Sequence, residues 1–375
     1  MPRNPLLLAA EHGQSIWLDN ITRGMIREGQ LEKLIEEDGI SGVTSNPAIF
    51  NKAMTQGNDY DDQIRRLSEE GKTATEIFEI MAIDDIQDAC DLFRPAHDRT
   101  NGTDGFVSLE VNPHLARDTQ GTIDEAMRLW EAVSRPNVLI KIPGTPEGLP
   151  AIQSCLASGI NVNITLLFSL EAYENVMNAH LAAMEERLRR GDPVASVASV
   201  ASFFLSRIDT KVDKQLDAIK DGNAEEAAAL RGKAAIASAR IAYQMWKKAY
   251  SGSRWETLET TGARFQKPLW ASTSTKDPTY PDVMYVETLI GPHTINTLPD
   301  QTVDAFRDHG KVAETLDSDL TGQQGILDRL QNIGVSMKQV TDELVDEGVA
   351  KFSEPFDQLI EALEEKRKSL TPSGA

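Results

Sequence analysis

Eight short runs typical of β-strands recur along the chain, and stretches with helical spacing separate them. The runs cover residues 16–19, 42–47, 106–111, 137–145, 161–165, 198–207, 268–276 and 294–298. Strands that alternate with helices predict an α/β fold with a parallel sheet. Eight such repeats favour a closed (β/α)8 TIM barrel over an open, doubly wound sheet. We therefore expect a single barrel domain over residues 1–375, with additional helices.

Three helices between the strands have visible boundary signals. Thr122 and Glu125 have the spacing of a capping box, which predicts a helix that begins there. A helix over 170–190 is expected to stop at Gly191, because glycine accepts the left-handed conformation of a helix end. An Ala-rich stretch over about 224–250 is expected to be one long helix.

The end of the chain differs in character from the barrel repeats. Residues from about 300 to 366 are acidic and have helical spacing, so they are predicted as C-terminal helices that pack on the barrel. Residues 367–375 are expected to be frayed. Nothing in the composition of this tail indicates its role.

The charge of the chain excludes some classes of partner. A net charge of −20 and a pI near 4.8 disfavour binding to nucleic acid or to a membrane surface, since both need a concentrated basic face. A small phosphorylated substrate remains compatible because it needs only a few local cations. The two cysteines are far apart and no signal-peptide pattern is present, so we expect a cytoplasmic protein.

One lysine stands out within the strand-like runs. Lys141 lies in the apolar run Val138–Pro143, which has the composition of a buried strand. Burial disfavours the charged form of an amine, and a neutral amine is a nucleophile, as in Schiff-base enzymes. The alternative is a lysine whose ammonium reaches solvent along an apolar stem. The lysine alone does not decide between these two interpretations.

Polar residues near the ends of the other strands favour the first interpretation. Catalytic groups of a (β/α)8 barrel lie at the carboxyl ends of its strands. If the barrel forms, it brings together Asp19, Asn46, Glu110, Lys141, Asn163, Thr165, Ser202 and Ser272. So many polar strand ends around one lysine predict an active site.

These strand ends also carry a family resemblance. The matching segments are 18–19, 44–47, 107–111, 138–143, 161–168, 202–207 and 270–273. In their order and residue types, the chain resembles the transaldolase family over roughly residues 14–300, and its length resembles the longer bacterial branch. The resemblance implies transfer of a dihydroxyacetone unit between sugar phosphates in the pentose phosphate pathway. It implies no metal and no organic cofactor.

The resemblance also implies a catalytic role for four residues. Lys141 would form the Schiff base, and Asp19 would accept the proton of the C4 hydroxyl when the C3–C4 bond breaks. Glu110 and Thr165 would hold the water that is used in proton transfer. A monomer or a homodimer is the expected assembly.

Further residues would bind the substrate. Arg207 matches the phosphate arginine of the family, for which a planar guanidinium offers two parallel contacts. Lys276 would substitute for a second arginine that the shorter members carry soon after Ser272. The complete expected set is Asn46, Asn163, Ser202, Phe204, Arg207, Ser272 and Lys276.

Three alternatives remain open at this stage. Arg207 would be a surface residue if it paired with Asp209 or Asp213. The enzyme would release free dihydroxyacetone if it resembled the fructose-6-phosphate aldolases, which have tyrosine where this chain has Phe204 and glutamine where it has Glu110. A catalytically inactive barrel would have lost the lysine or the carboxylates, and this chain retains them.

Overall fold

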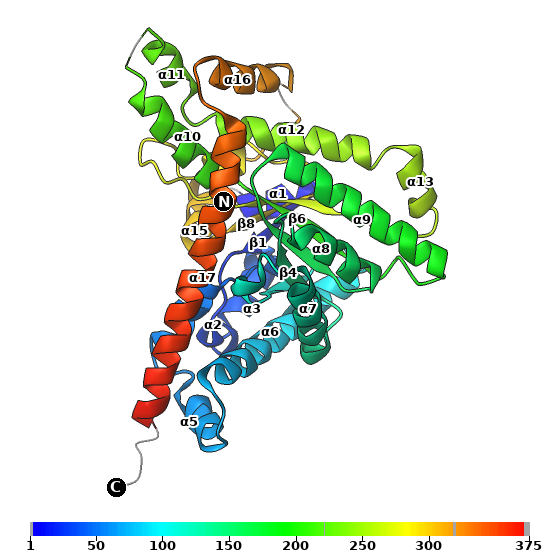
Figure 1. Cartoon of the computed structure of the whole chain (residues 1–375), viewed down its shortest axis with the longest axis vertical. Helices are drawn as coiled ribbons and strands as arrows, with labels where there is room; N and C mark the ends of the chain where they lie inside the picture. The colour runs from blue at the N-terminus through cyan, green and yellow to red at the C-terminus, as the bar shows by residue number, and fades with distance from the viewer. Residues whose placement is uncertain (1–2, 221, 318–319, 371–375) are drawn as a thin grey trace.

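A closed barrel of eight parallel strands forms the centre of the molecule, as the sequence predicted (Figure 1). The computed structural model describes residues 3–220, 222–317 and 320–370. Strand order follows chain order, and β1 closes the barrel against β8. The strands are β1 Gln14–Leu18, β2 Gly42–Val43, β3 Phe106–Glu110, β4 Val138–Pro143, β5 Val162–Leu167, β6 Ser199–Phe204, β7 Lys267–Ala271 and β8 Thr294–Leu298.

Helices surround the barrel and cover its apolar outer face. In the first half of the chain they are α1 Pro5–Glu11, α2 Arg23–Arg27, α3 Gln30–Asp38, α4 Pro47–Thr55, α5 Asp61–Glu69, α6 Ala74–Arg99, the 3-10 turn η1 Pro113–Leu115, α7 Thr119–Val133 and α8 Gly148–Ala157. In the second half they are α9 Leu170–Arg190, α10 Ser206–Ala218, α11 Ala224–Leu230, α12 Ala234–Ala249, α13 Ser253–Glu259, α14 Met284–Glu287, α15 Asp300–His309, α16 Leu320–Asn332 and α17 Met337–Leu370.

The parallel register aligns the polar residues of β3, β4 and β5. Glu110 of β3 lies directly beside Lys141 of β4, and Lys141 lies beside Asn163 of β5. Two residues further along, Pro143 pairs with Thr165. Because side chains of these strands alternate between the two faces of the sheet, this register directs the aligned residues into the barrel.

Two of the predicted helix boundaries are wrong and one is confirmed. α9 ends at Arg190, and Gly191 follows in the left-handed conformation with a φ of 78°. α7 begins before the predicted capping box, because the side chain of Asp118 caps it by accepting from the Gly121 N–H. The hydroxyl of Thr122 donates instead to the Leu115 carbonyl at 2.9 Å.

The Ala-rich stretch forms two helices, α11 and α12, instead of the single helix predicted. The break lies at Gly232, which has a φ of 65° and donates its N–H to Asp213 at 3.0 Å. A left-handed residue cannot continue a right-handed helix. The carboxylate therefore stabilises the turn that interrupts the helical pattern.

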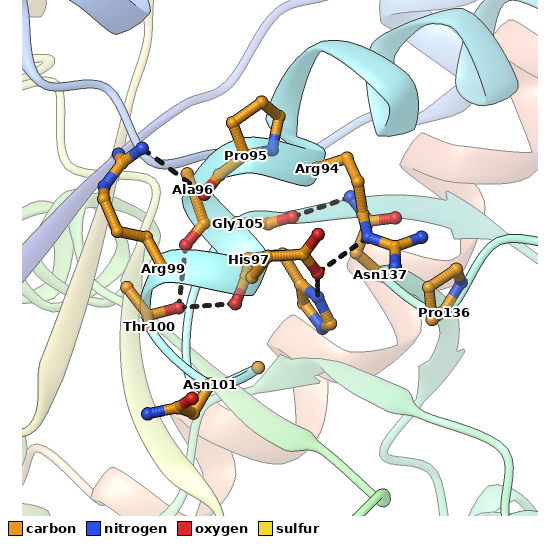
Figure 2. A network of polar contacts seen from close by, with 12 residues as sticks. Arg94, Pro95, Ala96, His97, Arg99, Thr100, Asn101, Gly105, Pro136 and Asn137 are labelled. Carbon is orange, nitrogen blue, oxygen red and sulfur yellow. Dashed lines mark hydrogen bonds and ion pairs between the residues drawn. The ribbon is translucent and has the colours of Figure 1, made fainter.

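The polar contacts in Figure 2 fix the connection from α6 to β3 at the amino end of the barrel. The Thr100 hydroxyl donates to the carbonyls of Ala96 and His97 at 3.0 and 3.1 Å, which completes the last turn of α6. Just before β4, the Asn137 side-chain amide donates to the Gly105 carbonyl at 2.9 Å. This end of the barrel therefore holds the strands in place, while the predicted site lies at the other end.

The acidic tail forms α15, α16 and α17, in agreement with the prediction of C-terminal helices. α17 is a long helix that runs past the barrel and contacts α4, α5, α6 and α10 (Figure 1). It continues to Leu370, further than the predicted frayed end at 367, and residues 371–375 lie outside the described residues. These contacts are consistent with one domain over 1–375, which we retain as a proposal.

Among the helices that the structure describes, none combines the length and the apolar character that crossing a membrane requires.

Candidate active site

Lys141 is buried inside the barrel, with only 5% of its surface exposed. Its ammonium donates to the backbone carbonyl of Ser45 at 2.9 Å and lies 3.2 Å from a carboxylate oxygen of Glu110. The alternative of a lysine that reaches solvent is therefore wrong. An amine held by a carbonyl and a carboxylate has a fixed position from which to attack a bound carbonyl group.

Glu110 is the only carboxylate that forms an ion pair with Lys141 among the described residues. Burial raises the pKa of Glu110, and the positive charge of Lys141 acts in the opposite direction. Both carboxylate oxygens are buried without a well-aligned hydrogen bond to any described residue, and the same holds for the Thr165 hydroxyl. Buried polar groups are normally satisfied, so these two residues have the capacity to hold a water or a substrate hydroxyl.

A cavity at the carboxyl end of the strands encloses about 440 Å3, including the part that opens to solvent. It is lined by residues from seven strands or strand ends, from α10 and from α17: Asp19, Thr44, Asn46, Lys141, Thr165, Ser202, Phe204, Arg207, Ala271, Ser272, Thr297 and Phe352. The sequence analysis named eight of these twelve lining residues. The barrel therefore brings most of the predicted site residues to one place.

The carboxylate of Asp19 is oriented by a chain of two hydroxyl groups. The Thr44 hydroxyl donates to Asp19 at 2.6 Å, and a second hydroxyl, that of Thr297, lies 2.8 Å from Thr44. Hydrogen bonds of this kind fix the direction in which a carboxylate oxygen faces the cavity. Asp19 has the geometry of a base that accepts a proton from a substrate hydroxyl.

Asn46 begins α4, and its side-chain oxygen accepts from the Ile49 N–H at 3.1 Å. This cap occupies the oxygen, so the NH2 group is the part available to a ligand.

Asn163 does not line the cavity, although the sequence analysis placed it with the substrate-binding residues. It is fully buried one layer deeper in the barrel. Its NH2 group donates to the Ser108 hydroxyl at 2.9 Å, and its oxygen accepts from the Ser202 hydroxyl at 2.7 Å. Asn163 is therefore positioned to orient Ser202, which does line the cavity.

Arg207 does not pair with the acidic residues on its own helix. Asp209 accepts from the Tyr285 hydroxyl and the Ala235 N–H, and Asp213 accepts from the Tyr280 hydroxyl. One guanidinium nitrogen of Arg207 is buried without a hydrogen-bond partner among the described residues. The interpretation of Arg207 as a surface ion-pair residue is therefore wrong.

Two aromatic rings border the Arg207 guanidinium. Its central carbon lies 5.2 Å from the centre of the Phe204 ring and 5.8 Å from that of Phe352. Burial lowers the pKa of Arg207, while Asp19 and Glu110 favour its charged form. A partly buried cation that has no ion-pair partner among the described residues is suited to receive an anionic group of a ligand.

Lys276 lies outside the inner cavity, in a wider opening that Arg207 also lines. Its ammonium donates to the Ser274 hydroxyl at 2.7 Å. Burial lowers the pKa of Lys276, and the nearby charge of Arg207 lowers it further. The hydroxyl of Ser272, a residue just after β7, lies 2.8 Å from the hydroxyl of Ser206. Arg207 and Lys276 therefore line the same opening, together with Lys211, Lys214 and Lys351.

The chain as a whole is similar to known proteins. The sequence model of the family described as Transaldolase/Fructose-6-phosphate aldolase matches residues 16–363. The chain belongs to this family. A protein named Transaldolase from Trichodesmium erythraeum is 46% identical over 99% of this chain and 100% of its own length. Proteins of the same name from Thermobifida fusca and Parafrankia are each 47% identical over 96% of this chain and over 97% and 98% of their own lengths.

Membership of the transaldolase/fructose-6-phosphate aldolase family extends past the region that the sequence analysis recognised. The resemblance was placed over residues 14–300, whereas the family match includes most of α17. This helix contributes Phe352 to the cavity. The tail is therefore part of the family region.

Four residues of the cavity were missed by sequence reasoning, namely Thr44, Ala271, Thr297 and Phe352. The first three follow or end strands, so the strand-end rule that found Asp19 was sufficient to include them. No comparable local signal marks Phe352, because it lies on a long amphipathic helix whose partners are distant in the sequence.

Proposed function

We propose that this chain is a transaldolase of the pentose phosphate pathway. It transfers a dihydroxyacetone unit from sedoheptulose 7-phosphate or fructose 6-phosphate to glyceraldehyde 3-phosphate or erythrose 4-phosphate. The observation that carries this proposal is a buried lysine, held between Glu110 and a backbone carbonyl, in a cavity that also contains Asp19. The names of the relatives support the same reaction.

The first step is attack of the Lys141 nitrogen on C2 of the ketose. Water leaves the resulting carbinolamine and an iminium forms, which withdraws electrons from the adjacent carbons. Glu110 and Thr165 hold the water that carries protons in this step, in keeping with their unsatisfied polar atoms. The raised pKa of Glu110 allows it to exchange a proton closer to neutral pH than an ordinary carboxyl group.

Cleavage of the C3–C4 bond follows when Asp19 removes the proton of the C4 hydroxyl. The C4 fragment leaves as an aldehyde, and the bonding electrons remain on the three carbons attached to Lys141 as an enamine. Its C3 then attacks the carbonyl carbon of the acceptor, and the steps run in reverse. Asn46 and Ser202 bind the hydroxyls of the three-carbon unit, with Asn163 orienting Ser202.

The phosphate of either substrate binds at the wide opening of the cavity. Arg207 provides the main contact, and Ser272 and Lys276 support it from the end of β7. Phe204 packs beside Arg207 and limits the directions that the guanidinium can take. No metal ion and no organic cofactor take part in these proposed steps, since the iminium itself provides the electron sink.

Borohydride trapping tests this mechanism. Reduction in the presence of fructose 6-phosphate should attach a three-carbon unit to the protein, and peptide mass spectrometry should locate it on Lys141. The Lys141→Met protein is the control and should remain unmodified. An unmodified Lys141 in the wild-type protein, or a label on another lysine, would refute the proposed role of this residue.

The second reaction in the family description is the release of free dihydroxyacetone, as in a fructose-6-phosphate aldolase. Among the described residues that line the cavity, Phe204 and Phe352 are the aromatic ones, and neither can donate a proton to the enamine. We therefore favour transfer. A coupled assay for free dihydroxyacetone without an acceptor distinguishes the two, and rapid release would support the aldolase.

A cytoplasmic location and a monomeric or homodimeric assembly complete the proposal. Cys90 and Cys155 are both buried and unpaired, which suits a reducing compartment. Sedimentation at several protein concentrations would establish the assembly.

A further inference from the structure

α17 lies unusually close to the mouth of the barrel at one point. Gly348 of this helix packs on Leu166 of β5, and a Cβ atom at Gly348 would lie 2.9 Å from the leucine side chain. Leu166 directly follows Thr165 and has a φ of 59°, at a place where the register of β5 against β6 shifts. The helix interior thus contains a glycine where close approach to the barrel requires one.

One helical turn after Gly348, Phe352 reaches the active-site cavity. Its ring centre lies 5.2 Å from the Lys141 nitrogen and 5.8 Å from the central carbon of Arg207. Only 5% of the Phe352 surface is exposed. The ring therefore forms an apolar wall of the cavity that faces both the reactive amine and the Arg207 guanidinium, and the neighbouring Lys351 lines the wide opening.

Charged contacts to neighbouring elements lie on either side of Phe352 along α17. Lys211 of α10 lies 2.7 Å from Glu343 and 2.5 Å from Glu347, on the turns just before Phe352. After Phe352, Asp357 pairs with His114 at 2.7 Å. The ring is thus located by contacts on both sides of it along the helix.

We propose that Phe352 excludes water from the enamine and thereby favours transfer to the acceptor over release of dihydroxyacetone. Phe352 would thus be a positioning and specificity-determining residue. This inference rests on the Schiff-base reaction proposed above. An enamine that waits for its acceptor is lost when water protonates it. A ring that covers the lysine on the open side prevents this loss without providing any acidic proton.

The competing reaction consumes one water molecule. Water gives a proton to C3 of the enamine, which becomes an iminium, and hydroxide remains. Hydroxide adds to C2, the C2–nitrogen bond breaks as the C2 carbonyl forms, and the nitrogen takes up the proton that the new hydroxyl loses. The products are free dihydroxyacetone and the amine of Lys141. Replacing Phe352 with a smaller residue opens a path for this water and should favour release over transfer.

The test measures the ratio of released dihydroxyacetone to transferred product, with fructose 6-phosphate as donor and erythrose 4-phosphate as acceptor. Phe352→Ala should raise this ratio at least about tenfold, which corresponds to roughly 1.4 kcal/mol less discrimination between the two fates. Phe352→Leu, which keeps apolar bulk, should stay near the wild-type ratio. The ratio distinguishes this role from a purely structural one, because partial unfolding lowers both reactions together.

Phe356 offers a matched control. It lies on the next turn of the same helix, is 7% exposed, and packs on Phe78 and His114 outside the active-site cavity. Phe356→Ala should lower the melting temperature to an extent similar to Phe352→Ala and leave the ratio unchanged. If both alanine variants raised the ratio equally, the effect would come from loosening of α17 and the inference would be overturned.

Borohydride trapping separates this inference from the proposed function. A Phe352→Ala protein that still forms the three-carbon adduct on Lys141, but shows the wild-type ratio, would overturn the role of Phe352 and leave the mechanism intact. Absence of the adduct in the wild-type protein would instead refute the mechanism. If Phe352→Ala does not fold, Phe352→Val and Phe356→Val serve as the pair.

Discussion

Replacing Lys141 with methionine should lower the stability of the folded protein, because the Glu110 carboxylate then remains buried without a cation beside it. The Lys141 nitrogen lies 3.2 Å from Glu110, and both side chains are buried. With an effective dielectric constant of about 20, two unit charges at this distance attract by about 5 kcal/mol. Methionine keeps most of the apolar stem and removes the charge, so Glu110 loses the cation that offsets its burial.

Glu110 can respond by taking up a proton. Burial already raises its pKa and Lys141 opposes this effect, so the Lys141→Met variant should raise the pKa of Glu110 further. A carboxyl group whose folded pKa exceeds its unfolded pKa stabilises the protein at low pH, and this contribution is lost as the pH rises through the folded pKa. At about pH 8 we expect the variant to be about 3–5 kcal/mol less stable than the wild type. The difference should shrink as the pH falls, by at most about 1.4 kcal/mol per pH unit.

Urea unfolding at about pH 8 and about pH 5.5 measures this effect, with tryptophan fluorescence as the signal. A second change, Glu110→Gln, removes the buried charge from the Lys141→Met protein and should restore much of the stability at the higher pH. Neither variant should transfer dihydroxyacetone at any pH. An equal loss of stability at both pH values, or a double variant no more stable than the single one, would refute the reasoning.

Three further results are expected. Burial raises the pKa of Asp209 to about 7, so the stability of the wild type should fall by up to about 4 kcal/mol as the pH rises from about 4 to 7, and urea unfolding of Asp209→Asn should show a smaller decrease. Arg207→Ala should weaken use of fructose 6-phosphate about tenfold to a hundredfold in kcat/KM and leave the slow reaction of unphosphorylated fructose unchanged, because only the phosphate contact is removed. Gly232→Ala should lower stability by about 1–2 kcal/mol in thermal unfolding, since Gly232 has a φ of 65° and the added carbon would lie 2.9 Å from Tyr280. Gly252→Ala, where the nearest atom is 4.0 Å away, is its control and should have little effect.

The barrel could be predicted because the sequence patterns that indicate its strands and helices are local. Each strand has a short apolar or alternating pattern, and the parallel order follows from the helices between them. The helix boundaries were less certain because competing signals lie close together. Asp118 and Thr122 are both good capping residues, and the structure uses Asp118. Gly232 was visible inside the Ala-rich stretch, but a single glycine does not by itself predict a break.

The depth of a residue inside the barrel was not predictable from alternation. Period-2 spacing places Asn163 and Thr165 on the same face of their strand. Their height along the barrel depends on the tilt and stagger of all eight strands, and these are not local properties. As a result Thr165 reaches the cavity, whereas Asn163 lies beneath it and contacts Ser202.

The contribution of α17 depends on contacts between residues far apart in the chain. Its surface ion pairs are each worth little, so its docking relies mainly on the buried apolar side chains along one face. Leu344 and Phe352 belong to this face, and Leu359 and Leu363 continue it. The residues that attach the helix therefore include the one that covers Lys141. A sequence pattern shows that such a helix has an apolar face, but only the folded chain shows that part of this face closes an active site.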